Sequence, residues 1–144
     1  MSTASKEILT KFVEGMKTYC AAKGYGFEKS PLGPQNLHLY ILGTKDKVYW
    51  CFIHVSTSVG LWGVSADWQD RINKVTGMTG NIKSDWFVAL LDGGPETGYR
   101  IPSDEFRNLM NDLSVGGTGK GQIKIERKHL RPTWRFHNFN GLAP

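Results

Sequence analysis

The fold class of this 144-residue chain is decided by one uninterrupted apolar run, Trp86-Phe87-Val88-Ala89-Leu90-Leu91. The run ends in Asp92-Gly93-Gly94-Pro95, a composition typical of a turn. A strand that is apolar at every position must be covered on both faces, as in a sheet between two layers. The run therefore predicts a central β-strand in a layered α/β or α+β fold.

Three helices are expected around this strand. Apolar residues recur at helical spacing over residues 5–23, with Ser5 as the N-cap and Gly24 as the left-handed stop. A short helix is predicted over residues 65–75, and a third begins at Ser103. The N-terminal helix presents one apolar face, which we assign to the core.

Further strands are expected before and after the central run. Residues 37–42 and 48–55 form a predicted hairpin, and residues 98–101 and 123–128 are also extended. With the apolar run, this gives a mixed sheet of about five strands. The Gly/Pro-rich residues 24–36 are expected to be a loop.

The register of the hairpin decides which side chains enter the core. A turn centred on Lys45 places Leu39 opposite Cys51 and Tyr40 opposite Trp50. We therefore expect Leu39 and Cys51 on the core face. Tyr40 and Trp50 then lie on a mixed, aromatic face that something must partly cover.

Composition limits the class of protein. Apolar residues make up 40% of the chain, which is enough for a packed core and excludes general disorder. No apolar run is long enough to cross a bilayer, so we expect no membrane partner. The N-terminus does not resemble a signal peptide, and Cys20 and Cys51 lie in apolar segments. These features favour a cytoplasmic protein with buried thiols. Without repeats or a linker, residues 1–144 are expected to form a single domain.

The positive charge is concentrated near the C-terminus. The whole chain carries a net charge of +5. Residues 120–135 contain six basic residues against Glu126 alone, which also leaves +5, so the rest of the chain is neutral. The six are Lys120, Lys124, Arg127, Lys128, Arg131 and Arg135. Such a patch is typical of a polyanion-binding protein, and it is equally compatible with a solvated strand and tail, residues 120–144.

Trp134 lies among these basic residues, in Arg131-Pro132-Thr133-Trp134-Arg135. An aromatic side chain between arginines can stack on a base of a nucleic acid. The alternative is that Trp134 docks on the domain and its arginines face the solvent. We expect a mixed outcome, in which Trp134 is structural and Arg131 and Arg135 are electrostatic.

A nuclease site is the main catalytic alternative. Glu126-Arg127-Lys128 has Glu-x-Lys spacing, which on a strand turns the carboxylate and the ammonium to the same face. Together with Asp92 these residues would hold Mg²⁺ against a phosphate. Cys51 and His54 do not suggest a zinc site, because residues three apart on a strand face opposite ways. No cofactor is expected unless the nuclease alternative holds.

Residues 37–115 resemble the core of small restriction-endonuclease-like domains, the PD-(D/E)XK superfamily. The resemblance rests on the order helix, hairpin, Trp/Gly-rich crossover, helix and apolar strand, and on residues 85–91 and 98–103. In that superfamily the second or third core strand carries the acidic residue and Glu-x-Lys. The corresponding strand here reads Cys51-Phe52-Ile53-His54-Val55-Ser56, without an acid. The resemblance therefore implies a relative that does not cut, whereas a catalytic Glu126 and Lys128 would exclude that alignment.

The sequence supports three hypotheses of function. The first is a nucleic-acid-binding domain that uses the basic C-terminal segment, with DNA favoured over RNA and no robust catalysis. The second is a Mg²⁺-dependent nuclease with Asp92, Glu126 and Lys128. The third is a protein-interaction module with an aromatic surface around Tyr40, Trp50 and Trp62. Self-association of the chain is left open.

Overall fold

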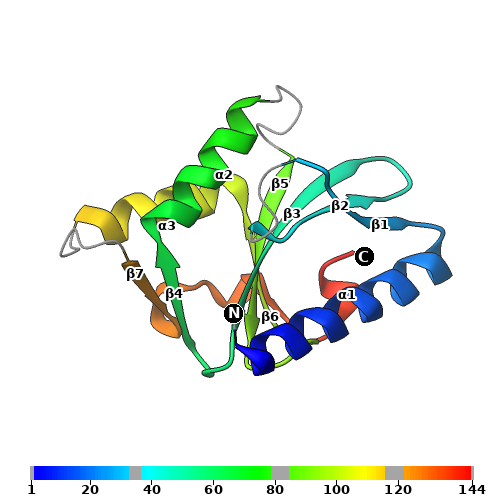
Figure 1. The fold of residues 1–144 in the computed structure, drawn as a ribbon, viewed down its shortest axis with the longest axis horizontal. Coiled ribbons are helices and arrows are strands. Elements are labelled where there is room, and N and C mark those ends of the chain that lie inside the picture. The colour runs from blue at the N-terminus through cyan, green and yellow to red at the C-terminus, as the bar shows by residue number, and fades with distance from the viewer. Residues whose placement is uncertain (1, 33–36, 79–84, 116–121, 144) are drawn as a thin grey trace.

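The computed structural model describes residues 2–32, 37–78, 85–115 and 122–143. A mixed sheet of six strands forms its centre, with helix α1 (Thr3–Lys23) on one face. Helices α2 (Ala66–Met78) and α3 (Ser103–Val115) lie on the other face (Figure 1). A separate two-stranded ribbon lies on the same side as α2 and α3. This is the α+β fold predicted from the sequence, with a larger sheet and an additional ribbon.

The order of the strands in the sheet is β1-β2-β3-β5-β6-β8. All neighbours are antiparallel except β3 and β5, which run parallel and are connected through β4 and α2. The ribbon consists of β4 (Leu61–Ser65) and β7 (Gln122–Glu126), again antiparallel. The six strands are β1 (Gly26–Lys29), β2 (Leu39–Gly43), β3 (Val48–Ser56), β5 (Trp86–Asp92), β6 (Gly98–Pro102) and β8 (Arg135–Phe136).

Strand β5 has the central place that its apolar sequence predicts. Every one of its residues is buried, and its alternate side chains enter two separate cores. Val88 and Leu90 face the core under α2, α3 and the ribbon. Phe87 and Ala89 face the core under α1. The sheet is therefore covered on both sides, as a strand of this composition requires.

The ends of the helices follow their capping residues. Gly24 ends α1 in the left-handed conformation, at φ 76°, as predicted. The N-cap of α1 is Ser2 and not Ser5, because the Ser2 hydroxyl accepts the Ser5 backbone N–H at 3.1 Å. Residues 24–36 were expected to be a loop, and this expectation is wrong in part: β1 lies there and pairs with β2.

The hairpin register differs from the prediction by one residue. Leu39 pairs with Phe52, and Tyr40 pairs with Cys51. Cys51 therefore packs in the core under α1, on the face opposite Leu39. The slip turns every side chain of β3 to the other face relative to the predicted hairpin.

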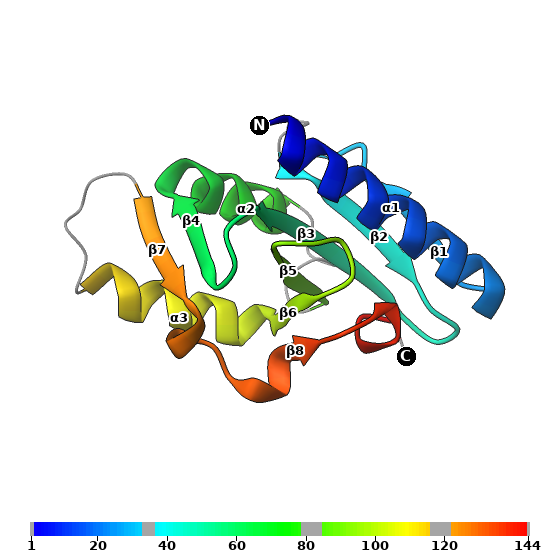
Figure 2. The same ribbon diagram turned by 90° about the horizontal axis from the view of Figure 1, so that it is seen from below.

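The chain after β8 crosses to the other face of the sheet and reaches α1, as Figure 2 shows. A short 3₁₀ helix, η5 (Phe139–Gly141), places the Phe139 ring 6.0 Å from that of Phe12. The Tyr19 hydroxyl donates to Asn140 Oδ1 at 3.0 Å. Leu142 and Ala143 are buried in the core under α1. Among the residues that the structure describes, no helix is both long and apolar enough to span a membrane.

Candidate nucleic-acid interface

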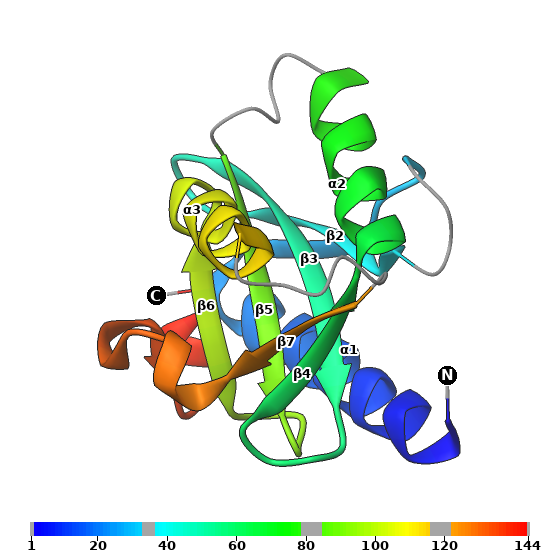
Figure 3. The same cartoon turned by 90° about the vertical axis from the view of Figure 1, so that its left-hand side faces the viewer.

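The basic part of the chain runs over the surface from the ribbon to the edge of the sheet (Figures 2 and 3). We call residues 122–136 the basic segment; it comprises β7, the 3₁₀ helices η3 (Arg127–His129) and η4 (Pro132–Trp134), and β8. It is anchored by the buried side chains of Ile125, Leu130 and Phe136. Lys120, one of the predicted phosphate-binding residues, lies outside the described residues.

Two of its arginines are held by one buried carboxylate. Asp92, at the end of β5, has a side chain with 0% exposure. Its Oδ2 accepts from Arg127 at 2.9 Å and from Arg135 at 2.6 Å. Its Oδ1 accepts the Gly60 backbone N–H at 2.7 Å. Both oxygens of Asp92 are therefore occupied, and the carboxylate ties the basic segment to the sheet.

The electrostatics of this cluster agree with its geometry. Burial by itself would raise the pKa of Asp92, but the Gly60 N–H and the two guanidinium groups lower it below its usual value. Arg135 is fixed further by Thr97, whose hydroxyl accepts from it at 2.9 Å, and by the Tyr99 ring at 4.9 Å. Arg135 is only 24% exposed, whereas Arg127 is 52% exposed. Of these two predicted phosphate contacts, Arg127 remains the more accessible.

The other basic side chains point outward. Lys124 is exposed on β7, and Lys128 is 74% exposed beside Glu126, with 3.3 Å between Nζ and Oε2. Arg131 is 64% exposed and lies 3.5 Å from Glu105 of α3. Its guanidinium carbon is 5.8 Å from the centre of the Trp134 ring. Exposed ion pairs of this kind contribute little to stability, so these cations can exchange a carboxylate for a phosphate.

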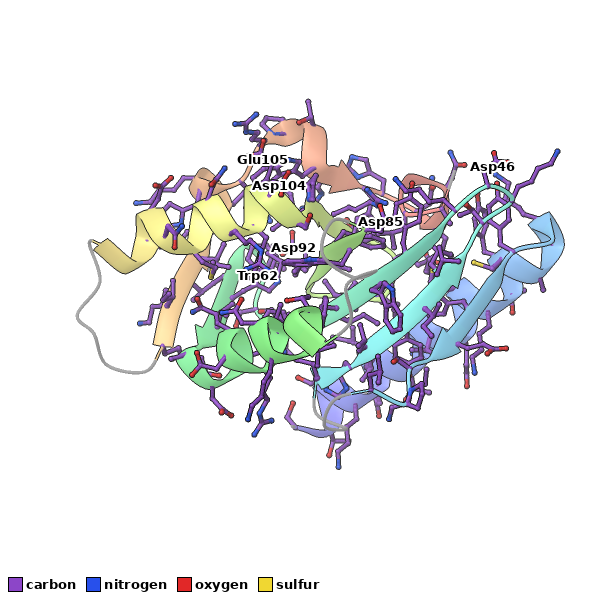
Figure 4. All side chains as sticks on the ribbon, turned by 90° about the horizontal axis from the view of Figure 1, so that it is seen from above. Asp46, Trp62, Asp85, Asp92, Asp104 and Glu105 are labelled. Carbon is purple, nitrogen blue, oxygen red and sulfur yellow. The ribbon has the colours of Figure 1, made fainter. Side chains whose placement is uncertain are left out.

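Trp134 lines a groove between α3 and the basic segment. We call this the Trp134 groove; its volume is about 430 Å³. Glu105, Asn108 and Asp112 line it from α3, and His129, Arg131 and Trp134 line it from the basic segment. In Figure 4, Glu105 lies on the side of α3 that faces this segment. Trp134 also packs against the core under α3, so its ring is half-buried. This position is compatible with the structural role expected for Trp134, and it also places Trp134 in the lining of the groove.

The α3 side of the groove was missed in the sequence. Glu105, Asn108 and Asp112 are three and four residues apart, so they form a polar stripe along the helix. The stripe lies next to the buried positions Phe106 and Leu109. The spacing of these polar residues can be recognised in the sequence, but the sequence does not show that the basic segment lies against this side of α3.

The two carboxylates of the nuclease hypothesis have other partners in the structure: Gly60, Arg127 and Arg135 bind Asp92, and Lys128 pairs with Glu126. Asp92 ends a strand of the six-stranded sheet, whereas Glu126 lies on the ribbon. Strand β7 ends at Glu126, so Lys128 belongs to η3 and the strand spacing assumed for Glu-x-Lys does not apply. Among the described residues, no three His, Cys, Asp or Glu side chains are grouped so as to hold a metal ion.

The aromatic surface of the third hypothesis is also not assembled. Trp62 is 1% exposed, and its Nε1–H donates to the Leu91 carbonyl at 2.8 Å. Tyr40 packs toward the core under α1, where it stacks on Phe27 at 5.0 Å. Trp50 packs toward the opposite core. The three rings therefore do not share a face.

Comparison with protein-family models, with curated proteins and with solved structures finds no match for this chain.

Proposed function

We propose that this chain is a nucleic-acid-binding domain of the restriction-endonuclease-like type, without robust catalysis. The observation that carries the proposal is the Trp134 groove, because it joins an aromatic ring, amide groups and exposed cations in one place. Aromatic rings stack on unpaired bases, and Asn side chains bond to base edges. Arg131, Lys128 and Lys124 would contact the phosphates along the basic segment.

The carboxylates of the groove favour an unstacked strand over a duplex. Glu105 and Asp112 repel phosphates, but a carboxylate accepts a hydrogen bond from the amino group of cytosine. Bases would therefore enter the groove while the phosphates stay on the basic segment. We propose single-stranded DNA as the ligand, with RNA as a comparison in the test.

The type of domain is proposed from the order of its elements. The resemblance is supported by the succession α1, β2–β3 hairpin, β4, α2 and β5 in the structure. Neither β2 nor β3 contains an acidic residue, so the pattern that the superfamily uses for cutting is absent there. A cytoplasmic location remains part of the proposal; it is supported by Cys20 and Cys51, which are both buried free thiols.

The decisive experiment compares two half-buried tryptophans. Trp134→Ala should weaken binding to single-stranded DNA by about 1–3 kcal/mol, the value of one stacked base. Trp50→Ala is the matched control, because Trp50 is also half-buried but packs on the sheet away from the groove. Fluorescence anisotropy at a temperature where both variants are folded measures the affinities. Equal affinity of both variants and the wild type for DNA and RNA strands would refute the proposal.

Cleavage is tested separately. We expect no Mg²⁺- or Mn²⁺-dependent cutting of DNA by the purified protein, because β2 and β3 lack an acidic residue and Arg127 and Arg135 already bind the buried carboxylate of Asp92. If the protein cuts, and Glu126→Gln abolishes cutting while the protein stays folded, the nuclease hypothesis replaces this one.

A further inference from the structure

A second pocket lies on the face of the sheet opposite the Trp134 groove. Its volume is about 370 Å³, within the range of small-molecule sites. It is lined by the hairpin residues Thr44, Lys45 and Asp46, by Tyr25 and Tyr49, by Gly141-Leu142 and by Arg100 of β6. In Figure 4, Asp46 marks the hairpin at this end of the sheet. We call it the Arg100 pocket.

Arg100 is held in place by aromatic rings. Its guanidinium carbon lies 4.0 Å from the centre of the Phe87 ring and 5.4 Å from that of Tyr49. These contacts fix the plane of the guanidinium group and partly compensate its removal from water. The side chain is half-buried, so the remainder of the group reaches the pocket.

Arg100 lacks the acidic partner that a buried arginine usually has. Its Nε is buried without a hydrogen-bond partner, and no ion pair joins it to a carboxylate among the described residues. Burial lowers the pKa of Arg100, which is the direction expected for a cation without an anion nearby. A buried donor of this kind costs stability unless something accepts from it.

The pocket has the charge of an anion site. Lys45 supplies a second cation, and among the described residues that line the pocket Asp46 is the only acid. Arg presents a planar fork of donors that matches the oxygens of phosphate, and Lys adds a point charge. The Tyr49 ring offers an apolar wall beside them. An anion with several oxygens joined to a flat organic group fits these features together.

We propose that the Arg100 pocket binds a phosphate monoester, with Arg100 and Lys45 on the phosphate and the tyrosine rings against the attached group. Two kinds of ligand carry this group: a free nucleoside monophosphate, and a DNA strand that ends in a 5′-phosphate. The proposal does not depend on the Trp134 groove, because that groove uses residues from the opposite face of the sheet.

The test measures binding of four probes to the wild-type protein. They are adenosine 5′-monophosphate, adenosine, and a short oligothymidine with and without a 5′-phosphate. We expect the phosphorylated member of at least one pair to bind, and to raise the thermal midpoint, while its unphosphorylated partner binds much less. A preference for the free nucleotide or for the strand end identifies the source, and either result supports the site. Equal behaviour with and without phosphate in both pairs overturns it.

Variants separate this site from others that bind anions. Arg100→Gln should raise the Kd of the phosphorylated probe about tenfold to a hundredfold, the loss expected for a charge-assisted hydrogen bond. Arg107→Gln is the matched control: Arg107 also lies over a ring, 5.2 Å from that of Trp86, but it is exposed on α3, over the opposite face of the sheet. It should leave the Kd unchanged. Equal Kd values for wild type and Arg100→Gln would overturn the proposal, and Trp134→Ala should not affect this binding.

Stability in phosphate-free buffer provides a second readout. Arg100→Met keeps an unbranched apolar side chain about as long as the stem of Arg, and removes the guanidinium group. If the guanidinium group gains its partner only from a ligand, this variant should be at least as stable as the wild type without the ligand. The phosphorylated probe should then stabilise the wild type and not the variant. A phosphate-dependent rise of equal size in both proteins would show that the anion binds elsewhere.

Discussion

Arg135 and Arg100 lie close together on neighbouring strands, yet their surroundings differ. Arg135 pairs in register with Tyr99, the residue before Arg100, and both guanidinium groups lie over an aromatic ring. Arg135 is bound by Asp92 and Thr97. Arg100, on the opposite face, has neither an ion pair nor a partner for its Nε among the described residues. The position of a charge in the sequence therefore does not show whether that charge is available to a ligand.

The largest effect is expected from removing the carboxylate that distinguishes the two arginines. Asp92→Asn should lower the free energy of unfolding by about 3 kcal/mol, because it leaves Arg127 and Arg135 without their buried partner. Urea unfolding measures this change. Asp67→Asn is the control, because Asp67 is 69% exposed in its pair with Arg71 and should cost less than about 1 kcal/mol. Similar costs for the two variants would contradict the central role of Asp92.

The next largest effect is expected when the stability costs of removing the two guanidinium groups are compared. Arg135→Met should cost about 2 kcal/mol, the value of hydrogen bonds to a charged group, since Asp92 loses one of its two guanidinium partners. Arg100→Met should cost nothing in phosphate-free buffer. Chemical denaturation of the two variants in the same buffer provides the measurement. A larger loss for Arg100→Met would invert the comparison.

Acid should reduce the difference between the arginines by neutralising Asp92. Because the folded pKa of Asp92 is lowered, its contribution to the free energy of unfolding is complete above about pH 3.9, the pKa of an unfolded Asp. This contribution is lost as the pH falls through the folded value.

Burial also lowers the pKa of His54, to about 4, so the wild type loses stability as the pH falls from about 6.5 towards that value.

The two titrations are separable by their variants. His54→Phe should reduce the loss of stability between about pH 6.5 and 4.5, where an unfolded His binds a proton that the folded one does not; part of the loss remains, because burial also lowers the pKa of His38. Asp92→Asn should keep the His54 slope and lose only the dependence below about pH 3.9. Thermal midpoints across this range check both expectations, and parallel curves for all three proteins would contradict them.

The smallest effect concerns the salt dependence of DNA binding. Lys124→Ala and Lys128→Ala should each reduce the slope of log K against log salt concentration by about one, since both side chains are exposed on the basic segment. Arg135→Met should leave the slope nearly unchanged, because Arg135 already binds Asp92. Titrations between about 50 and 200 mM salt provide the slopes. A wild-type affinity that does not vary with salt would remove the polyanion hypothesis.

The sequence predicted features that depend on neighbouring residues. The burial of β5, the stop at Gly24 and the start of α3 at Ser103 each follow from residues next to one another in the chain. Two predictions were wrong: the register of the hairpin, and the loop over residues 24–36, where β1 lies. Both features depend on pairing with another strand and not on local preference. The Asp92 cluster was not foreseen, since its arginines are 35 and 43 residues away in sequence.

The path of the chain after β8 has a consequence for folding during synthesis. Phe136, Leu142 and Ala143 fill part of the core under α1, although α1 is made first. The ribosome therefore releases α1 long before the residues that cover it on this face. Until residues 136–143 have emerged, α1 exposes apolar surface that a chaperone can bind. Nascent chains that stop before residue 136 should accordingly remain sensitive to protease, and chains that extend beyond residue 143 should become resistant.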